Sequence, residues 1–410
     1  MFENVIGQKK VVTSIREQIQ QNQFPRAVLF CGPAYSGKLT AALEVARVLA
    51  CTAKPSGEWG CTCSACVQHR RLTHPHLLIT GSRYVVQDIA ACAEAMRSAP
   101  MDATIYLFVR SVQKLVRRFD PILWDGEEAR LSKVLGHLES IGDAMDGIEP
   151  GTPIPEGSDL DARINRVIDA AAKITASIGS DNIPIHVIRN ISSWARLSSP
   201  ERGKVAILEN ADRMHDGSRN ALLKILEEPP EAVTFILLST NPAALPATIR
   251  SRVRPYVFPE RSEEDSLQVL QKIFRDTSGH VNSIRQYIMQ NSLLSNTGFE
   301  ALARRFLELV VANESAQPEQ PLEAIAAEVA ASAGRDGHRY FLEELVGACR
   351  RILWSERGGE KGVALPLAVL EGWNREIARH QRYMETLNMR PETVLQSLCL
   401  AMREHHAEVH

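Results

Sequence analysis

A glycine-rich loop that ends in a lysine is the first part of this sequence that could do chemistry. The apolar run AVLFC (27–31) predicts a buried strand, and it leads directly into GPAYSGK (32–38) and then into a helical pattern. Strand, glycine-rich loop and helix in this order are typical of a P-loop, whose backbone N–H groups surround a phosphate at a helix N-terminus. Gly32 and Gly37 are expected to shape the loop, and Lys38 is expected to reach the outer phosphates.

The residue after this lysine does not suit a magnesium-dependent ATPase. A P-loop has Ser or Thr at this position, whose hydroxyl binds Mg²⁺, and this sequence has Leu39. A leucine cannot coordinate a hard cation that requires oxygen ligands. Thr40 lies about 100° further around the helix, so its hydroxyl is expected to point elsewhere. A chance match to the motif is the alternative, but the flanking strand and helix favour a true P-loop fold with impaired metal binding.

A second motif has also lost a group that hydrolysis needs. The apolar run at 205–208 predicts another buried strand, which ends in Glu209 and Asn210. In active P-loop ATPases an acid at this strand end helps to hold Mg²⁺, and Glu209 occupies that position. AAA+ ATPases follow it with a catalytic glutamate, but the amide of Asn210 cannot act as a base. The two altered positions, Leu39 and Asn210, together predict an ATPase fold kept for another purpose.

Half of the eight cysteines cluster within sixteen residues: Cys51, Cys61, Cys63 and Cys66. In a reducing compartment such a cluster indicates a metal site, and four thiolates that close a tetrahedron are typical of structural Zn²⁺. The step from Cys63 to Cys66 is an ordinary C-x2-C, whereas the step from Cys61 to Cys63 is one residue shorter. Three nearby histidines are candidate substitute ligands: His69, His74 and His76. Four reduced thiols without a metal are the alternative.

Composition excludes several classes of protein. A chain of 410 residues exceeds one ordinary domain, so roughly two to four domains are expected. The formal net charge is -2, whereas a stand-alone nucleic-acid-binding protein is usually strongly basic. There is no run of about 18 uncharged apolar residues, and the N-terminal MFENVIGQKK lacks the basic start and apolar run of a signal peptide. We therefore expect a cytoplasmic protein without a membrane span.

The order of the motifs resembles that of bacterial clamp-loader subunits, which are AAA+ proteins. Besides GPAYSGK, the motifs that carry the resemblance are FENVIGQ (2–8), ENADRM (209–214), NALLKILEEPPE (220–231) and LSTNPAALPATIRSR (238–252). The resemblance covers roughly residues 1–80 and 183–260. It implies an α/β P-loop fold, with a parallel sheet flanked by helices, in a ring-like pentamer. Such a pentamer uses ATP to open a sliding clamp and place it around primed DNA.

The resemblance also implies a division into domains. Residues 1–258 would form the AAA+ module, with a zinc module at 51–66, and residues 259–292 would form a small helical lid. An all-α collar domain at 293–410 would hold the pentamer together. Residues 83–181 match nothing in the family core, and their apolar residues recur at helical spacing, so we expect a helical insertion packed on itself. Arg285 is a candidate sensor arginine of the lid, although an exposed helix face explains it more simply.

Two kinds of clamp-loader subunit share these motifs. Gamma/tau subunits are the motors that hydrolyse ATP and have an intact P-loop. Delta-prime subunits are often nucleotide-incompetent and act as a stator that presents an arginine finger to a neighbouring motor. Leu39 and Asn210 favour the delta-prime kind, which implies that this chain is not catalytic alone and that ATP and Mg²⁺ are doubtful ligands of it.

The arginine finger of the family lies in a Ser-Arg-Cys motif, which here has Arg252 and, in place of the Cys, Val253. A guanidinium aimed at a γ-phosphate across an interface stabilises the charge that develops there. A helix cap or a local ion pair is the alternative role of this arginine. Asn241 follows another apolar strand and matches the polar sensor 1 residue of the family.

The resemblance implies partners as well. They would be gamma/tau and delta subunits in a hetero-pentamer of the DNA polymerase III holoenzyme, the sliding clamp, and primed DNA through the assembly. A gamma/tau-type motor is the first alternative, and Leu39 and Asn210 disfavour it. A zinc-containing DNA-binding regulator on an AAA+ scaffold is the second, and the lack of a basic recognition helix disfavours it.

Overall fold

The computed structural model describes residues 1–53, 57–81, 85–178, 182–197, 203–279, 281–291, 298–311, 319–358, 365–386 and 389–407. The chain divides into two compact units, Met1–Ser292 and Leu293–His410. All strands of the described residues belong to the first unit, and the described residues of the second unit form helices joined by loops.

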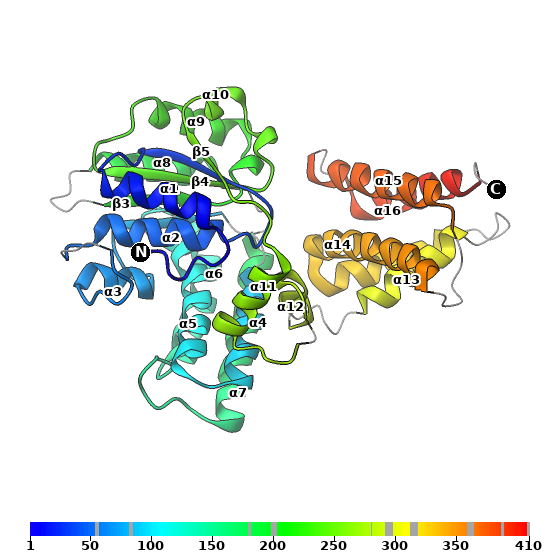
Figure 1. Cartoon of the computed structure of the whole chain (residues 1–410), viewed down its shortest axis with the longest axis horizontal. Helices are drawn as coiled ribbons and strands as arrows, with labels where there is room; N and C mark the ends of the chain where they lie inside the picture. Colours follow the sequence, from blue (N-terminus) through cyan, green and yellow to red (C-terminus); the bar gives the residue numbers. More distant parts are fainter. Residues whose placement is uncertain are drawn as a thin grey trace. The chain divides into compact units, whose positions relative to one another are not determined.

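A five-stranded parallel sheet forms the centre of the first unit (Figure 1), in the order β2-β3-β4-β1-β5. Its strands are β1 (Ala27–Cys31), β2 (Leu77–Thr80), β3 (Lys204–Leu208), β4 (Val233–Ser239) and β5 (Arg254–Val257). Every residue of β1, β2 and β3 is buried, which explains why their sequences are almost continuously apolar instead of alternating. Because the strands are parallel, the segments that follow β1, β3 and β4 begin at the same edge of the sheet.

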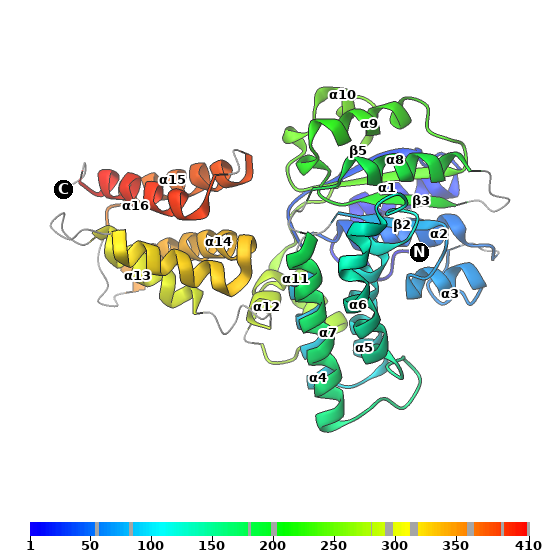
Figure 2. The same ribbon diagram turned by 180° about the vertical axis from the view of Figure 1, so that it is seen from behind.

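Helices cover both faces of this sheet (Figures 1 and 2). Val28 and Phe30 of β1 belong to the core under α1 and α2, whereas Ala27 and Leu29 belong to the core under α8 and α9. The four helices are α1 (Lys9–Gln20), α2 (Lys38–Ala50), α8 (Ile185–Arg196) and α9 (Asp216–Glu227). Alternate residues of one strand thus support two layers. The predicted α/β fold, a parallel sheet flanked by helices, is confirmed.

Shorter helical segments lie in the connections between the strands of the sheet. They are α3 (Ser64–Arg71), η2 (Ala211–Arg213), η3 (Pro242–Ala244) and α10 (Ala247–Arg250).

The described part of residues 83–181 is helical and extends away from the sheet (Figures 1 and 2). It contains α4 (Val85–Ser98), α5 (Asp102–Val116), η1 (Arg117–Phe119), α6 (Glu128–Met145) and α7 (Gly157–Ile178). These helices do not pack only on themselves as expected, because they share one apolar core with the segment that follows β5. That segment contains α11 (Glu263–Val269), the π-helical η4 (Leu270–Phe274) and α12 (Ile284–Gln290). The reason lies in α4, which is buried around most of its circumference and so needs neighbours on several sides.

The second unit is helical in its described residues, as its apolar repeats predict. Its helices are α13 (Phe299–Val311), α14 (Glu319–Gly358), α15 (Leu367–Thr386) and α16 (Pro391–Ala407). The rings of Phe306 and Phe341 meet edge to face with centroids 5.5 Å apart. Trp373 is fully buried and donates its indole N–H to the carbonyl of Met402 at 2.8 Å. Across the described residues, no helix combines the length and the apolar character that a membrane span requires.

Candidate functional site

The loop between β1 and α2 has the geometry of a phosphate-binding loop. Its first and last glycines both have positive φ angles, 150° at Gly32 and 95° at Gly37, and Gly37 is the N-cap of α2. A Cβ atom on Gly32 would lie 2.0 Å from the carbonyl oxygen of Phe258, so no larger residue fits there. The backbone therefore requires the glycines that the motif supplies.

The first three residues of α2 differ in their surroundings. Lys38 is buried, and its ammonium donates to the carbonyls of Gly32 at 2.7 Å and Pro33 at 2.6 Å within the loop. Leu39 packs against the apolar core between the sheet and α1 and α2, whereas Thr40 is half-buried. The position that normally supplies a Mg²⁺ ligand thus holds a partly buried apolar side chain.

The acidic end of β3 is already paired with a cation. Glu209 forms an ion pair with Arg118 of η1, and both side chains are largely buried, 15% and 9% exposed. Asn210 follows with a left-handed backbone (φ 56°) and is buried at the start of η2. The residues at this edge of the sheet therefore do not fit Mg²⁺. Leu39 has no oxygen to offer as a ligand, and the charge of Glu209 is neutralised by Arg118.

The remaining polar residues of the expected site lie at the ends of neighbouring elements. Asn241 is exposed directly after β4, and its backbone N–H donates to the hydroxyl of Ser239 at 3.0 Å. Arg252 follows α10 and donates to the carbonyl of Thr248 at 2.8 Å and to Glu227 of α9 at 2.9 Å. Since this ion pair is largely exposed, it contributes at most about 1 kcal/mol and can be exchanged for another partner. Arg285 lies exposed on α12.

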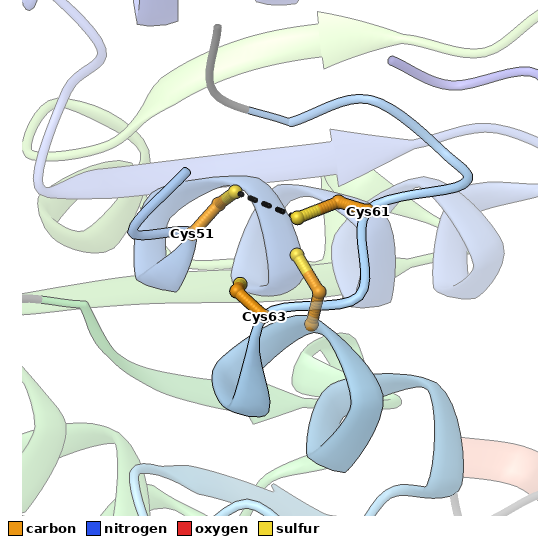
Figure 3. Close-up of side chains that lie close together, drawn as sticks. Cys51, Cys61 and Cys63 are labelled. Atoms are coloured by element: carbon orange, nitrogen blue, oxygen red, sulfur yellow. Dashed lines mark hydrogen bonds between the residues drawn. The ribbon is translucent and has the colours of Figure 1, made fainter. Parts of the chain in front are cut away.

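The four clustered cysteines come together between α2 and α3. Figure 3 shows the side chains of Cys51, Cys61 and Cys63 turned toward one another. Together with Cys66, these residues bring four sulfur atoms within 4.8 Å of one another. The sulfur atoms of Cys51 and Cys61 are 3.8 Å apart. Zn–S bonds of about 2.3 Å in a tetrahedron place sulfurs about 3.8 Å apart, so this arrangement is compatible with a structural zinc site.

The local backbone favours a thiolate at one position of this cluster, Cys63. Cys63 is the N-cap of α3, and although partial burial raises its pKa, hydrogen bonds from the backbone of Thr52 and Cys66 lower the pKa to about 6. Burial raises the pKa of Cys66 instead. A metal ligand must be a thiolate, and the ends of helices and nearby cations are the features that supply it.

Arg47 of α2 joins this cluster to the core of the first unit. Its guanidinium pairs with Glu44 through bonds of 2.7 and 2.9 Å, and both side chains are only 2% exposed. It also donates to the carbonyls of Gly57 at 2.8 Å and Glu58 at 3.0 Å and to the sulfur of Cys66 at 3.0 Å. A cation that bonds both the loop and a sulfur ligand is a typical outer-sphere support of a metal site.

The three histidines lie outside the group of four cysteines. His69 is buried and stacks on His74 with ring centroids 4.2 Å apart, and His76 meets His74 at 5.3 Å. Burial lowers the pKa of His69 to about 3, so this ring stays neutral. The cysteines reach one another without a substitute ligand, and the shorter step from Cys61 to Cys63 does not prevent this.

We predict that Arg47→Met destabilises the first unit by about 3–5 kcal/mol, because it leaves the carboxylate of Glu44 buried without its partner. Urea unfolding followed by fluorescence measures this change. Arg26→Met is the matched control, since Arg26 pairs with Glu231 at 3.7 Å and both side chains are well exposed. It should change stability by less than about 1 kcal/mol. Equal effects of the two substitutions would contradict the supporting role of Arg47.

A parallel sheet with a P-loop after one strand and an acid after another defines a P-loop NTPase-type module, here with altered metal-binding positions. The sequence model of the family described as "DNA polymerase III, delta subunit" matches residues 7–116 and 161–262, just over half of the chain. The chain belongs to this family, and the predicted resemblance to clamp-loader subunits is confirmed. The match includes parts of the segment 83–181 and breaks between residues 116 and 161.

Individual relatives include subunits of both kinds. The tau subunit of DNA polymerase III from Bacillus subtilis is 24% identical over 258 residues, which are 63% of this chain and 29% of the relative. The delta' subunit from Yersinia pestis is 39% identical over 80 residues, 19% of this chain and 24% of the relative. The chain thus spans under a third of the length of these curated relatives.

A solved structure was also found, of a gamma-subunit-related protein from Thermotoga maritima. It is 17% identical over 58% of this chain and 90% of that chain, but its TM-score of 0.31 is too low to carry an argument.

Two residues that bond the candidate sites escaped the sequence interpretation. Arg47 could have been found, because it and Glu44 are a charged pair, one helical turn apart, in a segment that is otherwise almost entirely apolar. Arg118 had no such signal, since its partner Glu209 lies 91 residues further along the chain.

Proposed function

We propose that this chain is a delta-prime-type stator of a bacterial clamp loader, an assembly subunit whose own nucleotide site does not hydrolyse ATP. The observation that carries the proposal is the state of that site. Leu39 is partly buried against the apolar core, Asn210 stands at the position of the catalytic glutamate, and Glu209 is paired with Arg118. The membership of the DNA polymerase III delta-subunit family supports the coarser part of the proposal, that the chain is a clamp-loader subunit.

In this role Arg252 would act on the nucleotide of a neighbouring subunit. Its guanidinium lies in a surface position after α10, where it bonds Glu227, the carbonyl of Thr248 and, at 3.4 Å, the hydroxyl of Ser251. On contact with a motor subunit it would leave Glu227 and approach the γ-phosphate, adding positive charge as the bond to the leaving group breaks. Asn241 would then serve mainly to brace the loop after β4.

The cysteine cluster would hold one Zn²⁺ through Cys51, Cys61, Cys63 and Cys66. Four protein ligands leave no open coordination position, so the metal would stabilise the fold and not take part in catalysis. Gly57 and Glu58, which Arg47 bonds, belong to the loop that the metal would close.

The partners would be gamma/tau and delta subunits in a hetero-pentamer, with the sliding clamp and primed DNA reached through the assembly in the cytoplasm. Residues 259–292 would be the lid and the helical unit from residue 293 onward the collar. This division into domains rests on the family resemblance and on the compact units of the chain.

The isolated chain should show no steady-state ATP hydrolysis, because neither a metal-binding hydroxyl nor a general base is present at positions 39 and 210. A coupled phosphate-release assay measures this. A turnover of about 1 s⁻¹ or faster, within the range of ordinary enzymes, would contradict the stator role if Lys38→Ala abolished it. That result would identify the chain as a gamma/tau-type motor instead.

A further inference from the structure

We propose that Arg118 replaces the metal ion of the nucleotide site, so that this site excludes divalent cations even where a hydroxyl ligand is available. The proposal rests on the proposed function, in which Glu209 occupies the metal position. It adds that Arg118 keeps this site free of a divalent cation. Arg118 lies in the part of the chain that the family model leaves unmatched, between residues 116 and 161.

The guanidinium of Arg118 is fixed from three directions. It donates to the carboxylate of Glu209, to the carbonyl of Gly81 at 2.6 Å, and to the carbonyl of Lys114. Gly81 follows β2, and a Cβ atom on it would lie 2.2 Å from the backbone oxygen of Glu209. Arg118 therefore bonds the ends of two adjacent strands where these ends approach closely.

The backbone that carries Arg118 is also fixed. The indole of Trp124 donates to the carbonyl of Arg118 at 2.7 Å, and the preceding Arg117 donates to the carbonyl of Leu72 at 2.6 Å. Arg117 also pairs with Asp120 at 2.8 Å. A cation held by a rigid backbone does not swing away to admit a competing metal, because several bonds would have to break together.

The charges around Glu209 are already balanced. Asp88 of α4 is half-buried, and the charges that act on it are those of Lys114, Glu209 and Arg118. Burial raises the pKa of Asp88 to about 6, which further weakens the negative charge available at mildly acidic pH. A divalent cation at Glu209 would meet the guanidinium of Arg118 on the same carboxylate, so its binding is opposed by Coulomb repulsion.

The test distinguishes the effect of Arg118 on metal binding from the effect of Leu39. The full chain, the Leu39→Thr variant and the Leu39→Thr/Arg118→Gln variant are each melted with ATP alone and with ATP plus Mn²⁺. No chelator is used, because a chelator would strip zinc from the cysteines. Mn²⁺ prefers oxygen ligands and does not compete for thiolates. We expect Mn²⁺ to add no stabilisation beyond ATP in the first two proteins and to raise the melting temperature of the double variant by several degrees.

Either of two results would overturn the proposal. The first is a Mn²⁺-dependent shift in the Leu39→Thr variant, since a hydroxyl alone would then restore the metal site with Arg118 in place. The second is no shift in a folded Leu39→Thr/Arg118→Gln variant. Leu39→Thr/Arg110→Gln is the matched control, because Arg110 lies on α5 and bonds the carbonyl of Arg70 instead of Glu209. Neither result bears on Arg252, so a failure here is distinct from a failure of the stator role.

Discussion

Replacing Arg252 by alanine should sharply reduce ATP hydrolysis by the reconstituted assembly. An arginine finger accelerates phosphoryl transfer by about 10³–10⁵ at the site that it contacts. Only one of several ATP sites would face this subunit. The hydrolysis rate of the whole assembly should therefore fall by a smaller factor than the rate at that one site, because the other sites continue to hydrolyse ATP. Clamp loading on primed DNA should fall with it. Steady-state phosphate release and a clamp-retention assay measure the two effects.

The fold and the assembly should survive this substitution. The side chain of Arg252 is one-third exposed, and its ion pair with the more exposed Glu227 contributes at most about 1 kcal/mol. Arg254→Ala is the matched control, since Arg254 is exposed on β5, two residues further along the chain. If Arg252→Ala and Arg254→Ala lowered the rate equally, the specific role of Arg252 would be refuted.

Loss of zinc should lower the stability of the fold more than any other change that we predict. Structural Zn²⁺ sites in small domains have apparent binding free energies of about 10–16 kcal/mol, and part of this energy supports the local fold. We expect one zinc per chain in wild-type protein, and a clear loss of both zinc and thermal stability in Cys63→Ser. Elemental analysis and thermal unfolding measure these quantities on protein purified without chelator.

The control for this prediction is Cys92→Ser, because Cys92 is buried on α4 outside the cluster and should leave the zinc content unchanged. Less than about a tenth of a zinc per chain in the wild type would rule out the metal site, since structural sites bind far too tightly to lose it in purification.

The parts of the site that depend on local sequence could be predicted. The P-loop depends on a strand, two glycines and a helix within about two dozen residues, and the backbone at Gly32 and Gly37 has the expected form. The cysteine cluster could also be predicted, because Cys61, Cys63 and Cys66 are close in sequence and Cys51 lies at the end of the preceding helix.

The parts that depend on long-range packing could not be predicted. Arg118 and Glu209 are brought together only by the fold of the helices within residues 85–178 against the ends of β2 and β3. The shared core of this segment with α11 and α12 is likewise invisible in the sequence, because helical periodicity tells which face is apolar but not which neighbour covers it.

The most direct test of the stator role compares two substitutions in this one chain within the reconstituted clamp loader. Lys38→Ala alters the chain's own nucleotide site, whereas Arg252→Ala alters what it would present to a neighbour. We predict that Arg252→Ala strongly lowers ATP hydrolysis and that Lys38→Ala changes the rate by less than about twofold, a difference under 0.5 kcal/mol in activation free energy. A loader that is crippled by Lys38→Ala and indifferent to Arg252→Ala would contradict the account and show that this chain is a motor.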